Sequence, residues 1–147
     1  MVKPTKPFPE RARARRRALQ ALYQWQIGGG PMRRIIEQFN EEQDMAIADG
    51  AYFSELLLGV EEHLETIDAT ILPFVDRGIE EIDAIERATL RLATFELLHR
   101  LDVPYRVVLN EAIDLAKDFG AEGGHTYVNG VLDRIARGAR QAEQQAR

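Results

Sequence analysis

The stretch from Ile85 to Leu101 constrains the fold most, because it is apolar on nearly every side of a helix. Nine of its residues are apolar: Ile85, Ala88, Leu90, Leu92, Ala93, Phe95, Leu97, Leu98 and Leu101. A helix of this kind is buried among other helices. Asp83 and Glu86 have the spacing of a capping box at its start. The stretch therefore predicts a central helix that needs several neighbours.

The rest of the chain supplies those neighbours as further helices, with almost no strand pattern. Apolar residues recur at intervals of three and four, and Gly-rich or Pro-containing segments interrupt them. Helices are expected over residues 10–25, 32–40, 52–72 with a break near residue 63, 83–100, 105–119 and 126–139. The sequence predicts an all-α single domain of about seven helices.

Length and composition fit one globular domain with a real core. The chain has 147 residues, 45% of them hydrophobic. Residues 1–10 are expected to form a flexible basic arm, residues 11–139 the helical domain, and the polar residues 140–147 a frayed tail. The absence of cysteine excludes disulfides and thiolate metal sites. Without a signal-peptide h-region or a membrane-spanning run, the chain is expected to be cytoplasmic.

Charge is distributed very unevenly along this acidic chain. Residues 1–26 carry seven Lys and Arg against one Glu, a net +6 within a chain whose formal net charge is −5. Residues 41–86 carry fourteen Asp and Glu, and Arg77 is the single Lys or Arg among them. Two solvated faces without specific partners would explain this pattern. Alternatively, the asymmetry indicates two surfaces with two kinds of partner.

The first helix is expected to bury one side and to present arginine on the other. At about 100° per residue, the buried stripe contains Ala14, Ala18, Leu22 and Trp25, and the opposite side contains Arg13, Arg16, Arg17, Gln20 and Gln24. Arg11 and Arg15 lie near the buried stripe, so that one of them is expected to pair internally. Tyr23 lies at the border. Arginine suits phosphate and tyrosine stacks on unpaired bases, which favours single-stranded RNA. DNA or an acidic membrane would suit the arginines equally well.

Motifs for catalysis or metal binding are not found. The three histidines are scattered without ligand spacing, and the sequence lacks a P-loop, a Rossmann fingerprint and a Gly-x-Ser-x-Gly motif. Glu96 and Glu111 are interpreted as structural carboxylates, with Arg100 placed for an i,i+4 pair with Glu96. The glycine-rich residues 120–124 are a weak match to a nucleotide site; a plain turn between helices is slightly favoured over an anion site ahead of a helix. We therefore expect neither an enzyme, nor a metal site, nor a cofactor.

Three long motifs resemble the NusB family of bacterial transcription antitermination factors. They read "ARRRALQALYQWQ", "IERATLRLATFELLHRLDVPYRVVLNEAIDLAKDFG" and "HTYVNGVLDRIA", and the likeness extends from Arg11 to Arg137. The resemblance implies an all-helical domain of two small bundles and a non-enzymatic adaptor. It also implies binding to boxA RNA of ribosomal RNA operons together with NusE, a small-subunit ribosomal protein. With RNA polymerase and other Nus factors, such a complex reads through terminators.

The resemblance also assigns site residues. It implies RNA binding by Lys6, Arg11, Arg13, Arg15, Arg16, Tyr23 and Tyr127, and NusE binding by Glu80, Glu81 and Glu86. Relatives often carry Asp or Ser where residues 122–124 read Glu-Gly-Gly, which leaves the contribution of this loop open. An acidic surface around residues 80–86 independently suits a basic ribosomal protein.

Two other functions are weighed against this one. Helical domains similar to this family also occur fused to ribosomal-RNA cytosine methyltransferases. The 147 residues contain no methyltransferase domain and no catalytic cysteine, which argues against an enzyme. The second alternative is a structural homodimer, or a helical interaction module, whose RNA surface is masked.

Overall fold

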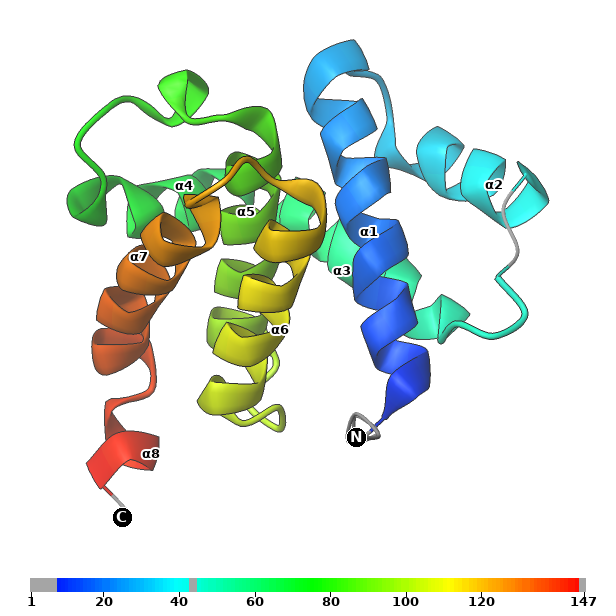
Figure 1. Ribbon diagram of the computed structural model, residues 1–147. Helices are drawn as coiled ribbons and strands as arrows, with labels where there is room; N and C mark the ends of the chain where they lie inside the picture. The colour runs from blue at the N-terminus through cyan, green and yellow to red at the C-terminus, as the bar shows by residue number, and fades with distance from the viewer. Residues whose placement is uncertain (1–7, 43–44, 146–147) are drawn as a thin grey trace.

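The computed structural model describes residues 8–42 and 45–145 and shows an all-α fold (Figure 1). Within these residues there is no strand. The helices are α1 (Pro9–Gly28), α2 (Met32–Glu42), α3 (Gly50–Glu62), α4 (Leu64–Ile71), α5 (Ala84–His99), α6 (Tyr105–Phe119), α7 (Gly124–Ala139) and α8 (Gln141–Gln145), with 3-10 turns η1 (Leu72–Phe74) and η2 (Ile79–Glu81). The predicted fold class is confirmed, and α8 and the two 3-10 turns are additions to it.

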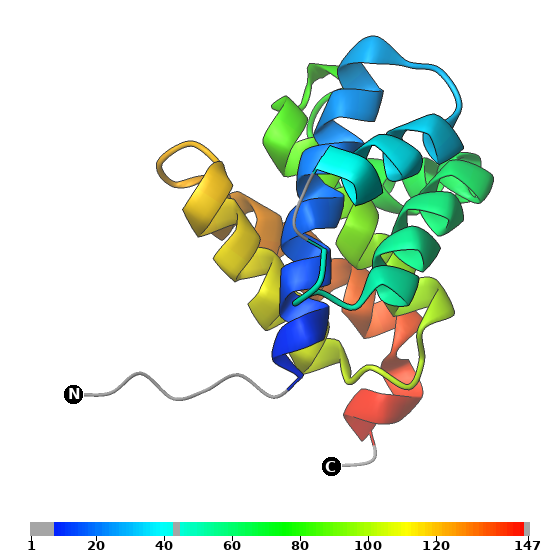
Figure 2. The ribbon, with the colours of Figure 1, turned by 90° about the vertical axis from the view of Figure 1, so that its right-hand side faces the viewer.

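The helices form two groups that meet along α5. Helices α1, α2 and α3 pack against one another, and α5, α6 and α7 form the second group. Helix α5 also contacts α1, α3 and α4, which makes it the common element. The two groups lie side by side in Figure 1, and the perpendicular view in Figure 2 shows α1 running beside the second group. This arrangement agrees with the expected two small bundles.

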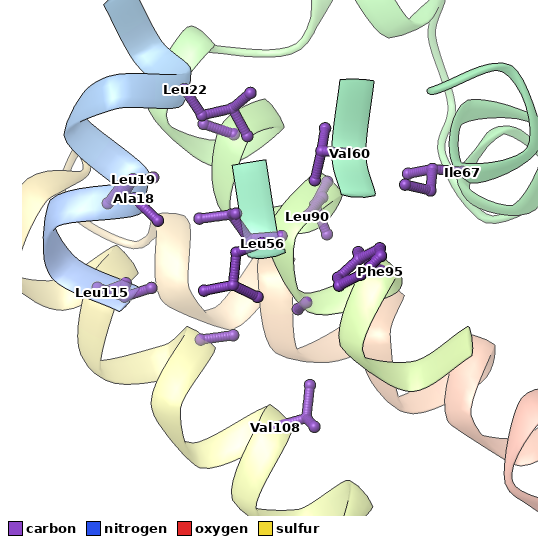
Figure 3. Close-up of a cluster of buried hydrophobic side chains, with 14 of the residues drawn as sticks. Ala18, Leu19, Leu22, Leu56, Val60, Ile67, Leu90, Phe95, Val108 and Leu115 are labelled. Atoms are coloured by element: carbon purple, nitrogen blue, oxygen red, sulfur yellow. The ribbon is translucent and has the colours of Figure 1, made fainter. Parts of the chain in front are cut away.

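The central helix is buried as its sequence predicts. Every residue of α5 from Arg87 to Leu97 is buried. Its apolar side chains meet residues from both groups, which Figure 3 shows as one continuous cluster. Helix α3 approaches α5 so closely that a Cβ atom on Gly59 would lie 2.2 Å from the Phe95 ring. Because real Cβ contacts are never this short, Gly59 permits the close packing of the two helices.

Helix ends are set by the residues that the sequence suggested. His63 ends α3 and begins α4, which confirms the expected break. The Asp83 carboxylate accepts hydrogen bonds from the backbone N–H groups of Ile85 and Glu86, at 3.0 and 3.2 Å. This cap satisfies two of the unpaired donors at the start of α5.

The expected domain boundaries need correction at both ends. Helix α1 begins at Pro9, so that residues 9 and 10 belong to the helix and not to the basic arm. Residues 1–7 of that arm, including Lys6, lie outside the described residues. At the other end Arg140 is buried, and residues 141–145 are helical. The prediction of fraying from residue 140 is wrong there, because the Arg140 side chain folds back onto the end of α5.

Candidate nucleic-acid interface

The amphipathic pattern of α1 places a row of arginines at the surface. Ala14, Ala18 and Leu22 are fully buried against the core, as expected. Trp25 differs from the expectation, because it is only half-buried and its indole N–H donates to the Gly30 carbonyl at 2.8 Å. On the other side the exposed or half-buried residues are Arg13, Arg16, Arg17, Gln20, Tyr23 and Gln24.

Arg15 does not belong to this surface, contrary to its assignment as an RNA-binding residue. It is buried, and its guanidinium donates to both carboxylate oxygens of Glu96, with Nε–Oε1 at 2.9 Å and Nη2–Oε2 at 2.8 Å. Burial lowers the pKa of Arg15, but the hydrogen bonds and charge of Glu96 raise it above its ordinary value. Of the two arginines near the buried stripe, Arg15 is therefore the one that pairs internally, as the helical angle suggested.

The expected pair of Glu96 with Arg100 is also wrong. Glu96 accepts a hydrogen bond from the Tyr52 hydroxyl in addition to those from Arg15. Arg100 turns away and pairs with Glu55 and Asp102. The bidentate hydrogen bonds from Arg100 lower the pKa of Asp102 to about 2, which keeps this exposed carboxylate ionised. Glu96 thus links α1, α3 and α5 at the junction of the two bundles.

Each of the three remaining arginines of the predicted set is held by one to three neighbours. The Arg11 guanidinium lies 4.6 Å from the Tyr52 ring centroid and 4.0 Å from Asp102. Arg13 donates to the Ile47 carbonyl at 3.1 Å. Arg16 pairs with Asp118 at 2.5 Å and lies over the Phe119 ring. These contacts orient the guanidinium groups while Arg13 and Arg16 remain exposed.

Arg13 and Arg16 form a ridge between two surface hollows. One hollow of about 260 Å³ is lined by Arg13, Arg16, Arg17, Gln20, Ile47 and Ala48. The other, of about 590 Å³, is lined by Pro9, Ala12, Arg13, Arg16, Asp114, Lys117 and Asp118. Lys117 comes from α6 and was not among the predicted residues, because nothing in the amino-acid sequence indicates that α6 ends beside α1. The ridge therefore presents two arginines, with one lysine nearby, to an extended ligand that lies along this surface.

Tyr127 and Tyr23 are placed differently from one another. Tyr23 is 38% exposed on α1. Tyr127 is half-buried on the first turn of α7, and burial raises its pKa. The guanidinium carbon of Arg77 lies 5.4 Å from the Tyr127 ring centroid. Sequence reasoning did not identify Arg77 as part of this site.

The three glutamates of the predicted protein-binding surface are not equivalent. Glu80 and Glu81 are exposed on η2. Glu86 is half-buried, and its carboxylate lies over Gly124, where a Cβ atom would come within 2.4 Å of Oε1. Burial and the charge of Asp83 raise the pKa of Glu86. Unlike Glu80 and Glu81, Glu86 is therefore only partly available to a protein partner, and it lies close to the start of α7 that carries Tyr127.

The structure offers little support for other kinds of site. Among the described side chains, no group of three or more His, Cys, Asp and Glu is placed to hold a metal ion. No described helix is long and apolar enough to cross a bilayer. A groove of about 730 Å³ beside the start of α1 is bordered by five carboxylates and two arginines. Its acidic border makes it a poor match for phosphate.

Comparisons with known proteins agree with the geometry. The sequence profile of the NusB family matches residues 12–137. A transcription antitermination protein NusB from Xanthomonas campestris pv. campestris (strain B100) is 62% identical over 126 residues, covering 86% of this chain and 79% of that protein. The structure is similar to that of T. maritima NusB, with a TM-score of 0.78, 32% identity and 93% coverage of both chains.

A further similar structure contains RNA and a second protein. It is a crystal structure of antitermination factors NusB and NusE in complex with dsRNA. The match has a TM-score of 0.75 and 27% identity, and covers 90% of this chain and 99% of the other.

Proposed function

The chain belongs to the NusB family of transcription antitermination proteins, and from that premise we propose that it binds single-stranded boxA RNA together with NusE. In this proposal the RNA comes from ribosomal RNA operons. The complex acts with RNA polymerase and other Nus factors in the cytoplasm, and the protein contributes binding surfaces without catalysis. The observation that carries the proposal is the exposed ridge of Arg13 and Arg16 beside Lys117.

The ridge suits RNA because its present contacts can be exchanged for phosphate. The Arg16–Asp118 pair is about half exposed on both sides. Exposed ion pairs contribute little to stability, so that losing one costs little. A phosphate accepts the same two parallel hydrogen bonds from arginine as a carboxylate does. Arg11, Arg13, Arg16 and Lys117 are therefore the candidate phosphate contacts, and Tyr23 and Tyr127 are candidates for base stacking.

The double variant Arg13→Ala/Arg16→Ala tests the RNA surface. We expect weaker binding to boxA RNA, and a slope of log affinity against log salt that is shallower by about 1.4, because each phosphate contact to a single strand contributes about 0.7. Fluorescence anisotropy over a series of salt concentrations measures this slope. The matched control is Arg33→Ala/Arg34→Ala, which removes the same charge from two exposed positions on α2. Equal slopes for the two variants would remove Arg13 and Arg16 from the RNA surface.

The exposed acidic turn η2 supports the second half of the proposal. Ribosomal proteins are commonly basic, and an acidic surface steers a basic partner toward itself. Glu80 lies 3.6 Å from the buried Arg91, and Glu86 packs against Gly124, so changes at either residue would also disturb the fold. Glu81 is the member of the predicted set whose charge is best reversed without this side effect.

Reversal of this charge in Glu81→Lys is expected to slow association with NusE several-fold at low salt, because attraction becomes repulsion. The difference should shrink as salt is added. The free energy of unfolding should change by no more than about 0.5 kcal/mol. The affinity of the isolated protein for RNA should not fall. Stopped-flow association with purified NusE measures the rate, and Glu41→Lys on α2 is the matched control. A loss no larger than that of the control would place the NusE surface elsewhere.

A further inference from the structure

Arg77 is an isolated basic residue within the acidic segment of residues 41–86. It is the single Lys or Arg among residues 41–86, where Asp and Glu number fourteen. Its guanidinium nevertheless lies against an aromatic ring of α7. We propose that Arg77 is an RNA-contact residue: it leaves the Tyr127 ring when an unpaired base stacks there, and then binds a phosphate beside that base. This inference rests on the RNA binding proposed above.

The surroundings of Tyr127 place Arg77 between the ring and an incoming base. The Tyr127 hydroxyl is buried, and within the described part of the chain it has no hydrogen-bond partner. Its hydroxyl end thus points inward, while the guanidinium carbon of Arg77, whose side chain is 43% exposed, lies over the ring at 5.4 Å from its centroid. A base that stacks on this face of Tyr127 therefore displaces the guanidinium or stacks upon it.

The contacts that hold Arg77 in place are weak enough to exchange. Its Nε donates to the carboxylate of the neighbouring Asp76 at 2.9 Å, and the Asp76 side chain is 74% exposed. Exposed ion pairs and exposed cation–π contacts each stabilise little, whereas a base stacked on an aromatic side chain stabilises more. The released guanidinium can form with a phosphate the paired hydrogen bonds that it now makes with Asp76.

The path of the chain connects this site to the arginine ridge. Arg16 contacts Asp118 and Phe119 at the end of α6. Residues 120–123 then lead directly into the first turn of α7, where Tyr127 lies. Figure 1 shows this α6–α7 connection between α1 and the start of α7. A single RNA strand can therefore contact the ridge on α1 first and the Arg77–Tyr127 pair next.

The test is a titration of fluorescently labelled single-stranded boxA RNA at several salt concentrations. We expect Arg77→Ala to weaken binding roughly three- to tenfold at low salt and to reduce the log–log slope by about 0.7. Arg77→Lys keeps the charge and should restore the slope. The matched control is Arg137→Ala, which removes another exposed arginine paired with an aspartate, Asp133, and should change binding less than about twofold.

A double-mutant cycle with Tyr127→Leu asks whether the two residues serve one nucleotide. If they do, Arg77→Ala should cost clearly less in the Tyr127→Leu background than in the unchanged protein. Thermal melting of each variant shows whether it is folded. If Tyr127→Leu melts at a clearly lower temperature, Tyr127→Phe takes its place, because it keeps the ring and removes only the unpartnered hydroxyl. This variant must bind RNA as the unchanged protein does. In its background Arg77→Ala must also have its full effect.

The outcomes separate this inference from the proposed function. If Arg77→Ala binds as well as or better than the unchanged protein while Arg13→Ala/Arg16→Ala binds poorly, the inference is wrong and the function stands. If none of these variants loses affinity, the proposed RNA surface itself is wrong. If Arg77→Ala costs the same with and without the Tyr127 ring, the exchange at that ring is refuted.

Discussion

Replacing Glu96 by alanine is expected to destabilise the fold by about 3–5 kcal/mol, because it leaves a buried guanidinium without its counter-charge. Arg15 and Glu96 are both nearly inaccessible to solvent, with side chains 5% and 3% exposed. The Tyr52 hydroxyl would lose its acceptor at the same time. Urea unfolding, followed by circular dichroism, measures the change in free energy.

The matched control for this result is Glu55→Ala. Glu55 also pairs with an arginine, Arg100, but its side chain is 47% exposed. Its loss should cost no more than about 1 kcal/mol. A second comparison is the double variant Arg15→Met/Glu96→Leu, which removes both charges and should recover most of the stability. If Glu96→Ala were no worse than Glu55→Ala, Arg15 would not be a buried partner of Glu96.

The sequence predicts what depends on local pattern. The apolar residues of α5 require a buried helix, glycine and proline mark where helices end, and Asp83 marks where α5 begins. The 3.6-residue period also separates the buried Ala14, Ala18 and Leu22 from the exposed Arg13 and Arg16. These features depend on neighbours within one or two turns, so the fold class and the arginine ridge could both be inferred.

Long-range pairing could not be inferred in the same way. Arg15 and Glu96 are 81 residues apart, and Arg77 and Tyr127 are 50 positions apart. Periodicity shows which side of a helix is buried but not which side chain it meets there. A long arginine side chain adds to the difficulty, because its charged end reaches far from its own Cα atom. The positions of Arg15, Arg77 and Arg140 therefore became visible only in the folded chain.

Charge counts alone also overstate how much free charge the basic and acidic surfaces present. Several carboxylates of the acidic segment are paired within the fold: Asp68 binds Arg91 through two hydrogen bonds, and Glu55 binds Arg100. On the basic side Arg15 is lost to the core. The basic and acidic surfaces left for partners are consequently smaller than the charge counts suggest. They also lie closer together than their positions in the sequence suggest, because Glu86 packs against the start of α7, which carries Tyr127.

Arg140→Met is expected to lower the free energy of unfolding by about 3 kcal/mol. The buried Arg140 guanidinium donates to the backbone carbonyls of Glu96, Leu97, Arg100 and Val103. Glu96 and Leu97 belong to the last turn of α5, where a positive charge is favourable. The Glu96 carbonyl also accepts from the Arg100 N–H and the Arg100 carbonyl from the Val103 N–H, so the Leu97 and Val103 carbonyls depend most on Arg140. Each buried carbonyl left without a donor costs about 1–3 kcal/mol, less where water enters. Methionine keeps much of the apolar stem, so the change reports on these hydrogen bonds and on the ion pair of Arg140 with Glu143, at 2.7 Å.

Two comparisons make this prediction specific to Arg140. Arg137→Met, one turn earlier on α7, changes an exposed arginine and should alter stability by no more than about 0.5 kcal/mol. A chain that ends after Arg140 should keep most of its stability, whereas one that ends after Ala139 should lose as much as Arg140→Met. Chemical denaturation of the four proteins gives the comparison. If the chain ending after Ala139 were as stable as the one ending after Arg140, the tail would contribute nothing through Arg140, and the end of α5 would be satisfied by water instead.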